Sequence, residues 1–386
     1  MPINFLSLKS QITEMGSEAR AREAGIQSAL KELRTLLDAR ATDLIALQKL
    51  VEEEAQKSKS LRCAIPVSEP LNAHIACLLP APTCTILAAD GSQINPDPHD
   101  TVFYGLVNIG VFRMQPGSGL TPQEITDSAL IYGDRLYAGG STLSEDLVAL
   151  LRDVNERKVL ARMAKSETAP VITLTDGPLE LFHEPRHDQQ FREYFEQYLN
   201  ALSDLALHNI TTAGYVSRPR ADLVVKLLSL AQKDVAGHSE SDGIVGLTDI
   251  ALFNHLLAPG ERSAIFRMQS RSSADYPDRK ALHFFYLNAG TIEQPAFARV
   301  EIPLWVVEDP NTITLLHSVL VEQARCNPTA PYPYPLLRAH EIAVVKLPER
   351  QQVTTMIEAE LLRRGFPPAR KSQKQINKDY SGRKRK

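Results

Sequence analysis

The chain has 386 residues and lacks long hydrophobic runs. No stretch approaches the roughly 18 consecutive apolar residues that cross a bilayer. The segment 1–9 also lacks the basic region and apolar core that mark a secretory signal. These absences exclude a membrane-spanning protein of the usual helical kind, and we expect a cytoplasmic one.

Cysteine is scarce, with four residues in the whole chain. Most pairs are too far apart in sequence for a ribbon-type zinc site, and a pattern of closely spaced pairs is missing. The sequence therefore predicts reduced thiols in the core. The four are Cys63, Cys77, Cys84 and Cys326.

An excess of positive charge is missing as well, because 43 Lys and Arg residues face 46 Asp and Glu residues, for a net charge of -3. A basic surface that coats nucleic acid is excluded, so any such contact must be local. The last residues, 363–386, are a local exception, since ten Lys and Arg side chains face only Asp379. Such a segment is typical of a disordered tail that attracts polyanions or keeps the protein soluble.

Proline is absent between Pro2 and Pro66, and this region is rich in Ala, Leu, Glu, Lys and Gln. Leucines recur at spacings of three, four and seven from Leu33 to Leu50, which predicts one or two amphipathic helices over 5–57. We interpret residues 1–65 as a helical arm. The arm would either mediate dimerisation or partner docking, or pack on its own domain.

Two apolar runs in the chain end in Asp-Gly. The first is Thr85-Ile-Leu-Ala-Ala-Asp-Gly-Ser-Gln93, and the second is Val171-Ile-Thr-Leu-Thr-Asp-Gly-Pro178. Each run fits a strand buried on both faces, and we expect the chain to turn directly after Asp90 and after Asp176. Asp-Gly is a common turn dipeptide, but two strand-end carboxylates also suit a divalent metal.

Between and after these strands the pattern alternates between helix and strand, as in β-α-β units. A helix predicted over 144–165 carries Glu156, and an apolar helix near 336–345 carries His340. Either side chain could join the two aspartates, although a solvated glutamate and a core histidine are the ordinary alternatives. Arg218 and Arg220 follow a strand predicted to end at residue 216 and could meet phosphate.

Taken in order, the motifs resemble the NurA nuclease family. They are Asp90-Gly-Ser-Gln93, a helix bearing Glu156, Asp176-Gly-Pro-Leu179 and Tyr334-Pro-Leu-Leu-Arg-Ala-His340. Their order and spacing carry the resemblance, which covers about residues 83–347. Family members commonly have a lysine where this chain has Arg218, and arginine suits a phosphate clamp better than an acid because it holds its proton.

The resemblance implies an α/β fold with an RNase H-like mixed sheet flanked by helices over 83–347, between the helical arm and the basic tail. It further implies a homodimeric DNA nuclease, exonuclease or single-strand endonuclease, that uses Mn²⁺ or Mg²⁺. The partner would be a hexameric HerA-type translocase in DNA end resection or repair. Asp90, Glu156, Asp176 and His340 would hold the metal, and Arg218, Arg220 and Arg338 would contact DNA.

Two other functions fit the sequence. One is a catalytically inactive adaptor that keeps the fold and binds the translocase and DNA. The other is a DNA tether that works mainly through the basic tail. Both would leave the two Asp-Gly turns as structural features.

Overall fold

The structure is a computed structural model that describes residues 3–138, 140–168, 170–182, 189–236 and 246–366. The chain divides into two compact units, and each is described by itself. Unit 1 comprises Met1–Pro82 and Tyr215–Tyr332, and unit 2 comprises Thr83–Gly214 and Pro333–Lys386. The predicted helical arm therefore lies in unit 1, and the range 83–347 contributes to both units.

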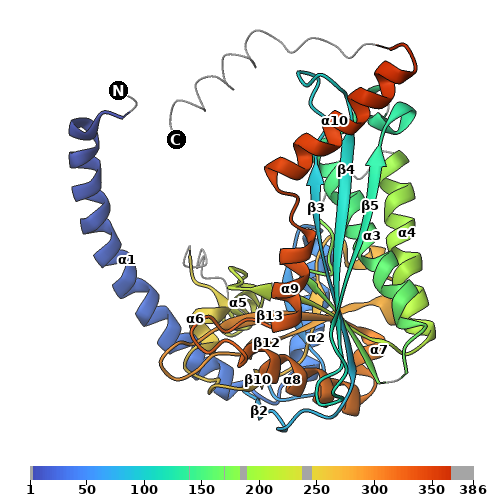
Figure 1. Cartoon of the computed structure of the whole chain (residues 1–386). Helices are drawn as coiled ribbons and strands as arrows, with labels where there is room; N and C mark the ends of the chain where they lie inside the picture. The colour runs from blue at the N-terminus through green and yellow to red at the C-terminus, as the bar shows by residue number, and fades with distance from the viewer. Residues whose placement is uncertain (1–2, 139, 169, 183–188, 237–245, 367–386) are drawn as a thin grey trace. The chain divides into compact units, whose positions relative to one another are not determined.

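Unit 2 is built on a mixed sheet in which β3 is central. Figure 1 shows its strands β3, β4 and β5 side by side. On one side β3 pairs with β4 and β4 with β5, both antiparallel, and on the other side β3 pairs with β8 in parallel. The first residues of β9 follow β8, which gives the order β5-β4-β3-β8-β9. This mixed sheet with flanking helices confirms the predicted α/β, RNase H-like fold. The strands are β3 (Thr85–Ile94), β4 (Gly105–Met114), β5 (Gln123–Ile131), β8 (Val171–Asp176) and β9 (Thr211–Ser217).

The first half of β3 is buried on both faces, as its unbroken apolar run predicts. The turn expected at Gly91-Ser92 is wrong, because β3 continues to Ile94 and stays paired with β4 along this stretch. The second turn is present, since β8 ends at Asp176 and Gly177 has a φ of 91°, a left-handed value that favours glycine. Asp90 thus lies within a strand, beside the point where the neighbouring strand stops.

Helices α3 and α9 cover opposite faces of this sheet, and two glycines reveal which face each one takes. A Cβ at Gly110 would lie 2.5 Å from the backbone nitrogen of Ala343 in α9, whereas a Cβ at Gly91 would lie 2.5 Å from Cγ of Arg152 in α3. Gly110 pairs with Asp90, and residues paired across strands point to the same face. The side chain of Asp90 therefore faces α9, and position 91 faces α3.

The helices of unit 2 follow the predicted pattern, with one addition. The helix α10 was not predicted, and its partly buried apolar side chains are Val353, Ile357 and Leu361. These side chains pack on a cluster that includes Ile94 and Tyr104. The helices are α3 (Glu145–Ala164), α4 (Gln189–Leu207), α9 (Tyr334–Ala343) and α10 (Leu347–Arg363), and a short hairpin joins β6 (Tyr137–Ala138) and β7 (Ser141–Thr142).

Unit 1 has its own antiparallel strands. β11 pairs with β1 and β12, β12 pairs with β13, and β10 pairs with β12 and β2. The strands are β1 (Cys63–Pro66), β2 (His74–Ala76), β10 (Glu261–Ser263), β11 (Phe266–Gln269), β12 (Leu282–Asn288) and β13 (Phe297–Pro303). The helices are α1 (Phe5–Ala39), α2 (Leu44–Lys57), α5 (Leu223–Ala236), α6 (Asp249–Phe253), α7 (Leu304–Val307) and α8 (Pro310–Ala324).

The sequence predicts one or two helices in the N-terminal segment, and the structure has two, α1 and α2. Only the second half of α1 is buried, through Leu30, Leu33 and Leu37. Nearer its start, apolar side chains such as Leu6 and Met15 are exposed for 86% and 67% of their surface.

Within the described residues, no helix is long and apolar enough to cross a membrane. Most of the predicted basic tail, residues 367–386, lies outside the described part of the chain.

Burial of His317 predicts a pH effect on stability. This α8 side chain is 2% exposed and its Nε2 lies 2.9 Å from the carbonyl oxygen of Gly260, and burial lowers its pKa to about 4. As pH falls below about 6.5, His317 becomes protonated in the unfolded chain but stays neutral in the folded chain. The free energy of unfolding therefore decreases. Relative to His317→Gln, the wild type should lose about 2 kcal/mol of unfolding free energy between pH 7.5 and pH 5.

Urea unfolding at both pH values measures this difference. The matched control is His208→Gln, which changes an exposed histidine. A difference between wild type and His317→Gln that does not change with pH would show that His317 titrates normally in the folded protein.

Candidate active site

Asp90 and Asp176 are neighbours in the sheet. The parallel register of β3 and β8 pairs Ala89 with Thr175, and each aspartate is the next residue of its strand. Asp176 is the last residue of β8, so the two aspartates lie at the same level of adjacent strands, where β8 ends. The structure therefore brings together the two aspartates that the sequence singled out.

His340 joins this pair from α9. Its Nδ1 lies 2.6 Å from Oδ2 of Asp90, while Oδ1 of Asp90 accepts a hydrogen bond of 2.9 Å from the backbone N–H of Gly91. The imidazole is 59% exposed and the aspartate side chain only 17%. Asp90 is thus held in position by two donors, and the histidine lies between it and solvent.

The residues around Asp90 in β3 and β4 explain why α9 ends where it does. The hydroxyl of Ser92 and the amide of Asn108 both donate to the last helical carbonyl, that of Ala343, at 2.5 Å and 2.8 Å. These bonds satisfy a carbonyl that the helix end leaves without an internal partner. Gly110 lets the α9 backbone approach β4, because a Cβ there would lie 2.6 Å from the carbonyl oxygen of Ala339. Together these contacts fix His340 opposite Asp90.

Glu156 reaches the same region from the other face. It lies on α3 with 6% of its surface exposed, and its Oε1 would be 2.7 Å from a Cβ at Gly91. The pKa of this carboxyl is raised well above its usual value, first by burial and then by the negative charges of Asp153 and Asp90. Because Gly91 has no side chain, the buried carboxyl group of Glu156 can lie next to Asp90. Gly91 therefore serves close packing and not a turn.

Arg152 and Asp153 are site residues that the sequence reasoning missed. Nη2 of Arg152 pairs with Asp153 at 2.8 Å, its Nε lies 3.7 Å from Glu156, and its Nη1 donates to Gln93 at 3.4 Å. Gln93 belongs to the same Asp-Gly-Ser-Gln motif as Asp90. One turn of helix separates Arg152 from Glu156, so the i,i+4 spacing on α3 was the available signal.

A recess of about 240 Å³ opens beside these side chains. Glu156 and Asp153 line it from α3, and Thr175 and Asp176 line it from the end of β8. A second arginine, Arg157, also borders it and donates from Nη2 to the hydroxyl of Thr175. The recess therefore combines acidic and basic groups at the end of one strand.

The chemistry of these residues fits a divalent cation. Asp90, Asp176 and Glu156 offer the oxygen ligands that hard cations prefer. Burial, followed by the negative charges of Asp153 and Asp90, raises the pKa of Glu156, and a bound cation would offset this effect. Over the ranges that the structure describes, however, no three His, Cys, Asp or Glu side chains form a ready-made metal site. Side-chain rotation would have to bring the ligands together.

The three predicted DNA-contacting arginines differ in their surroundings. Arg338, on α9, forms ion pairs with Glu124 and Glu341 and lies over the ring of Phe112. Arg218 and Arg220 belong to unit 1 and are exposed. Arg338 therefore belongs to the same unit as Asp90, whereas Arg218 and Arg220 belong to unit 1.

Comparisons with known proteins identify the family of this chain and similar folds. The family model described as the NurA domain matches residues 84–345. The crystal structure of the NurA nuclease from Sulfolobus solfataricus matches with 13% identity over 92% of this chain and 97% of that chain, at a TM-score of 0.51. The catalytic domain of human endonuclease V gives 11% identity, 82% and 98% coverage and a TM-score of 0.33. No curated protein matches.

Close packing at Gly110 predicts that Gly110→Ala is destabilising. The new methyl group would meet the α9 backbone rather than a movable side chain, so the whole helix must shift. We expect the unfolding free energy to fall by about 1–3 kcal/mol, measured by urea denaturation. Gly16→Ala is the control, because a Cβ there meets nothing within 4 Å and alanine favours a helix by about 1 kcal/mol. Equal stability of Gly110→Ala and wild type would contradict the packing described here.

Proposed function

The chain belongs to the NurA family, and from this premise we propose that it is a metal-dependent DNA nuclease. The observation that carries the proposal is that Asp90 and Asp176 directly follow the paired residues Ala89 and Thr175 of neighbouring strands, with His340 on Asp90. The nuclease named in the Sulfolobus structure supports the reaction class. The preferred metal would be Mn²⁺ or Mg²⁺.

In this proposal Asp90, Asp176 and Glu156 hold the cation, with His340 as a further ligand or proton carrier. When bound, a divalent cation supplies a lowered pKa for attacking water and stabilises charge on the phosphate oxygens. Asp90 is oriented for this role by the donors on its two oxygens. Burial raises the pKa of Glu156, and a bound cation would favour its carboxylate form.

His340 is suited to moving a proton. Its Nδ1 is directed at Asp90, which leaves Nε2 on an exposed ring to take a proton from the attacking water. Arg338, Arg218 and Arg220 would neutralise the DNA backbone, so binding would tolerate different sequences and weaken with salt. For Arg338 this requires DNA phosphate to compete with Glu124 and Glu341.

We further propose that the protein acts as a homodimer with a hexameric HerA-type translocase in DNA end resection or repair. The helical arm, residues 1–65, would serve one of these contacts, which agrees with the exposed Leu6 and Met15 on α1. The nuclease range would be 83–347, and residues 363–386 would form the basic tail.

The proposal predicts that Asp90→Asn and Asp176→Asn abolish DNA cleavage. Each change removes a carboxylate charge and a metal ligand while keeping the side-chain size. We expect the cleavage rate with Mn²⁺ to fall by at least about 100-fold, whereas DNA affinity should hold. The rate is measured as cleavage of end-labelled single-stranded and duplex DNA in the presence of Mn²⁺ or Mg²⁺.

Asp204→Asn is the matched control, since its carboxylate pairs with Lys165 on the surface. This variant should cleave like the wild type. Full cleavage by both Asp90→Asn and Asp176→Asn would contradict the assigned site. If the wild type itself neither cleaves DNA nor binds Mn²⁺ in a calorimeter, the inactive adaptor becomes the better function.

The partner proposal makes a separate prediction. Light scattering after size exclusion should give twice the monomer mass, and mixing with a HerA-type hexamer should give a larger complex. Exchanging the exposed Leu6 and Met15 for glutamate should remove one of these two associations. A double variant that keeps both associations would exclude the start of α1 as a docking surface.

A further inference from the structure

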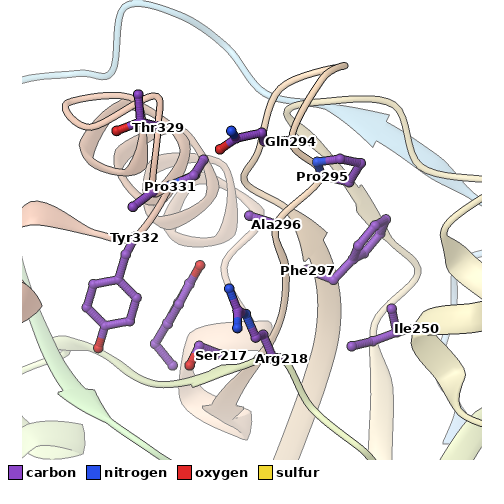
Figure 2. Close-up of a pocket in the computed structure, with 12 residues that line it drawn as sticks. Ser217, Arg218, Ile250, Gln294, Pro295, Ala296, Phe297, Thr329, Pro331 and Tyr332 are labelled. Carbon is purple, nitrogen blue, oxygen red and sulfur yellow. The ribbon is translucent and has the colours of Figure 1, made fainter.

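Unit 1 contains a cavity of about 720 Å³ that is lined by Arg218, one of the arginines proposed to contact DNA (Figure 2). Its walls come from the end of β9, from α6, from the loop that leads into β13 and from residues 329–332 after α8. Pockets for small ligands commonly measure roughly 300–1,000 Å³. The cavity is therefore large enough for a ligand the size of a nucleotide.

The charge of the cavity favours an anion. Arg218 is the only Lys or Arg among its described lining residues, and none of these residues is Asp or Glu. Within the described chain, the guanidinium of Arg218 has no ion pair, in contrast to that of Arg338 with its two glutamates. A guanidinium in a recess without carboxylates attracts phosphate.

The backbone holds Arg218 at the cavity in an unusual conformation. Its φ is 47°, a left-handed value that non-glycine residues rarely adopt, and Pro219 follows it. The N–H of Arg218 donates to the carbonyl oxygen of Phe297 at 3.0 Å, which fixes this conformation against β13. Strained residues of this kind concentrate at functional sites.

An aromatic ring lies on one side of Arg218. Figure 2 shows Tyr332 and Thr329 on that side, and Phe297 and Ile250 on the other. Tyr332 meets the buried Tyr215 edge to face, with ring centroids 5.5 Å apart and planes at 90°. This contact fixes the orientation of the Tyr332 ring. Ser217, Gln294 and Thr329 add hydrogen-bonding groups to the wall.

We propose that this cavity takes one unpaired nucleotide of a DNA strand, with its phosphate on Arg218 and its base stacked on Tyr332. The inference rests on the proposed function for its choice of polymer. A base within a duplex is already stacked and paired and does not enter such a recess, whereas an unpaired base does. The site would therefore favour single-stranded over duplex DNA.

The test compares two oligomers of equal length and charge in EDTA, one of thymidine and one of abasic residues. In fluorescence anisotropy, the wild type should bind the thymidine oligomer about tenfold more tightly, since base stacking on an aromatic ring is lost without bases. Tyr332→Ala should remove this preference, and Tyr332→Phe should keep it. Arg218→Gln should weaken binding of both oligomers about tenfold, because it removes a charge-assisted bond.

Arg271→Gln is the matched control, because Arg271 is an exposed arginine of unit 1 that does not line the cavity and has no proposed contact with DNA. It should keep the full preference for thymidine. Equal binding of both oligomers by the wild type, or an unchanged preference in Tyr332→Ala, would overturn the proposal. If Tyr332→Ala fails to fold, as shown by its thermal unfolding, wild type, Tyr332→Phe and Arg218→Gln decide the outcome.

The EDTA assay requires no cleavage, so it separates this proposal from the nuclease. A thymidine preference in the wild type together with cleavage by Asp90→Asn would leave the cavity assigned and the catalytic site wrong. Loss of cleavage in Asp90→Asn with no thymidine preference in the wild type would support the catalytic site and overturn the proposal for the cavity.

Discussion

The parallel pairing of β3 with β8 is the constraint on which the candidate site depends. Backbone hydrogen bonds set its register, and that register puts Asp90 and Asp176 at the same level. A slip of one residue would put the two aspartates at different levels. β8 stops at Asp176, whereas β3 continues beyond Asp90. The two aspartates therefore lie where β3 loses its neighbouring strand, and Thr175 and Asp176 border a recess at this point. The sheet thus positions two negative charges that repel each other.

The Asp-Gly-Ser-Gln motif has a structural reason at each position. Alternation along β3 directs Asp90 and Ser92 to α9 and directs positions 91 and 93 to α3. Asp90 meets His340, Ser92 bonds the end of α9, Gly91 leaves room for Glu156, and Gln93 accepts from Arg152. Four consecutive residues therefore connect both covering helices to one strand, and each of the four has a contact that suits its residue type.

Much of the site could be predicted from sequence because its parts are local. An apolar run that ends in aspartate identifies a buried strand, and two such runs single out Asp90 and Asp176. The continuation of β3 past Gly91 could not be predicted, because glycine there serves close packing against α3 and not a turn. The role of Arg152 depends on how α3 faces β3, which helical periodicity alone does not determine. Helix α10 was not predicted, and it packs on its unit through apolar side chains that are only partly buried.

The central claim is that Asp90 and Asp176 share a divalent cation. Anomalous diffraction at the manganese edge, from crystals of this protein grown with Mn²⁺, tests it most directly. The account predicts an anomalous peak within ligand distance of both carboxylates, roughly 2.0–2.6 Å from an oxygen of each. A manganese ion bound elsewhere, or none at this position at a saturating concentration, would contradict it.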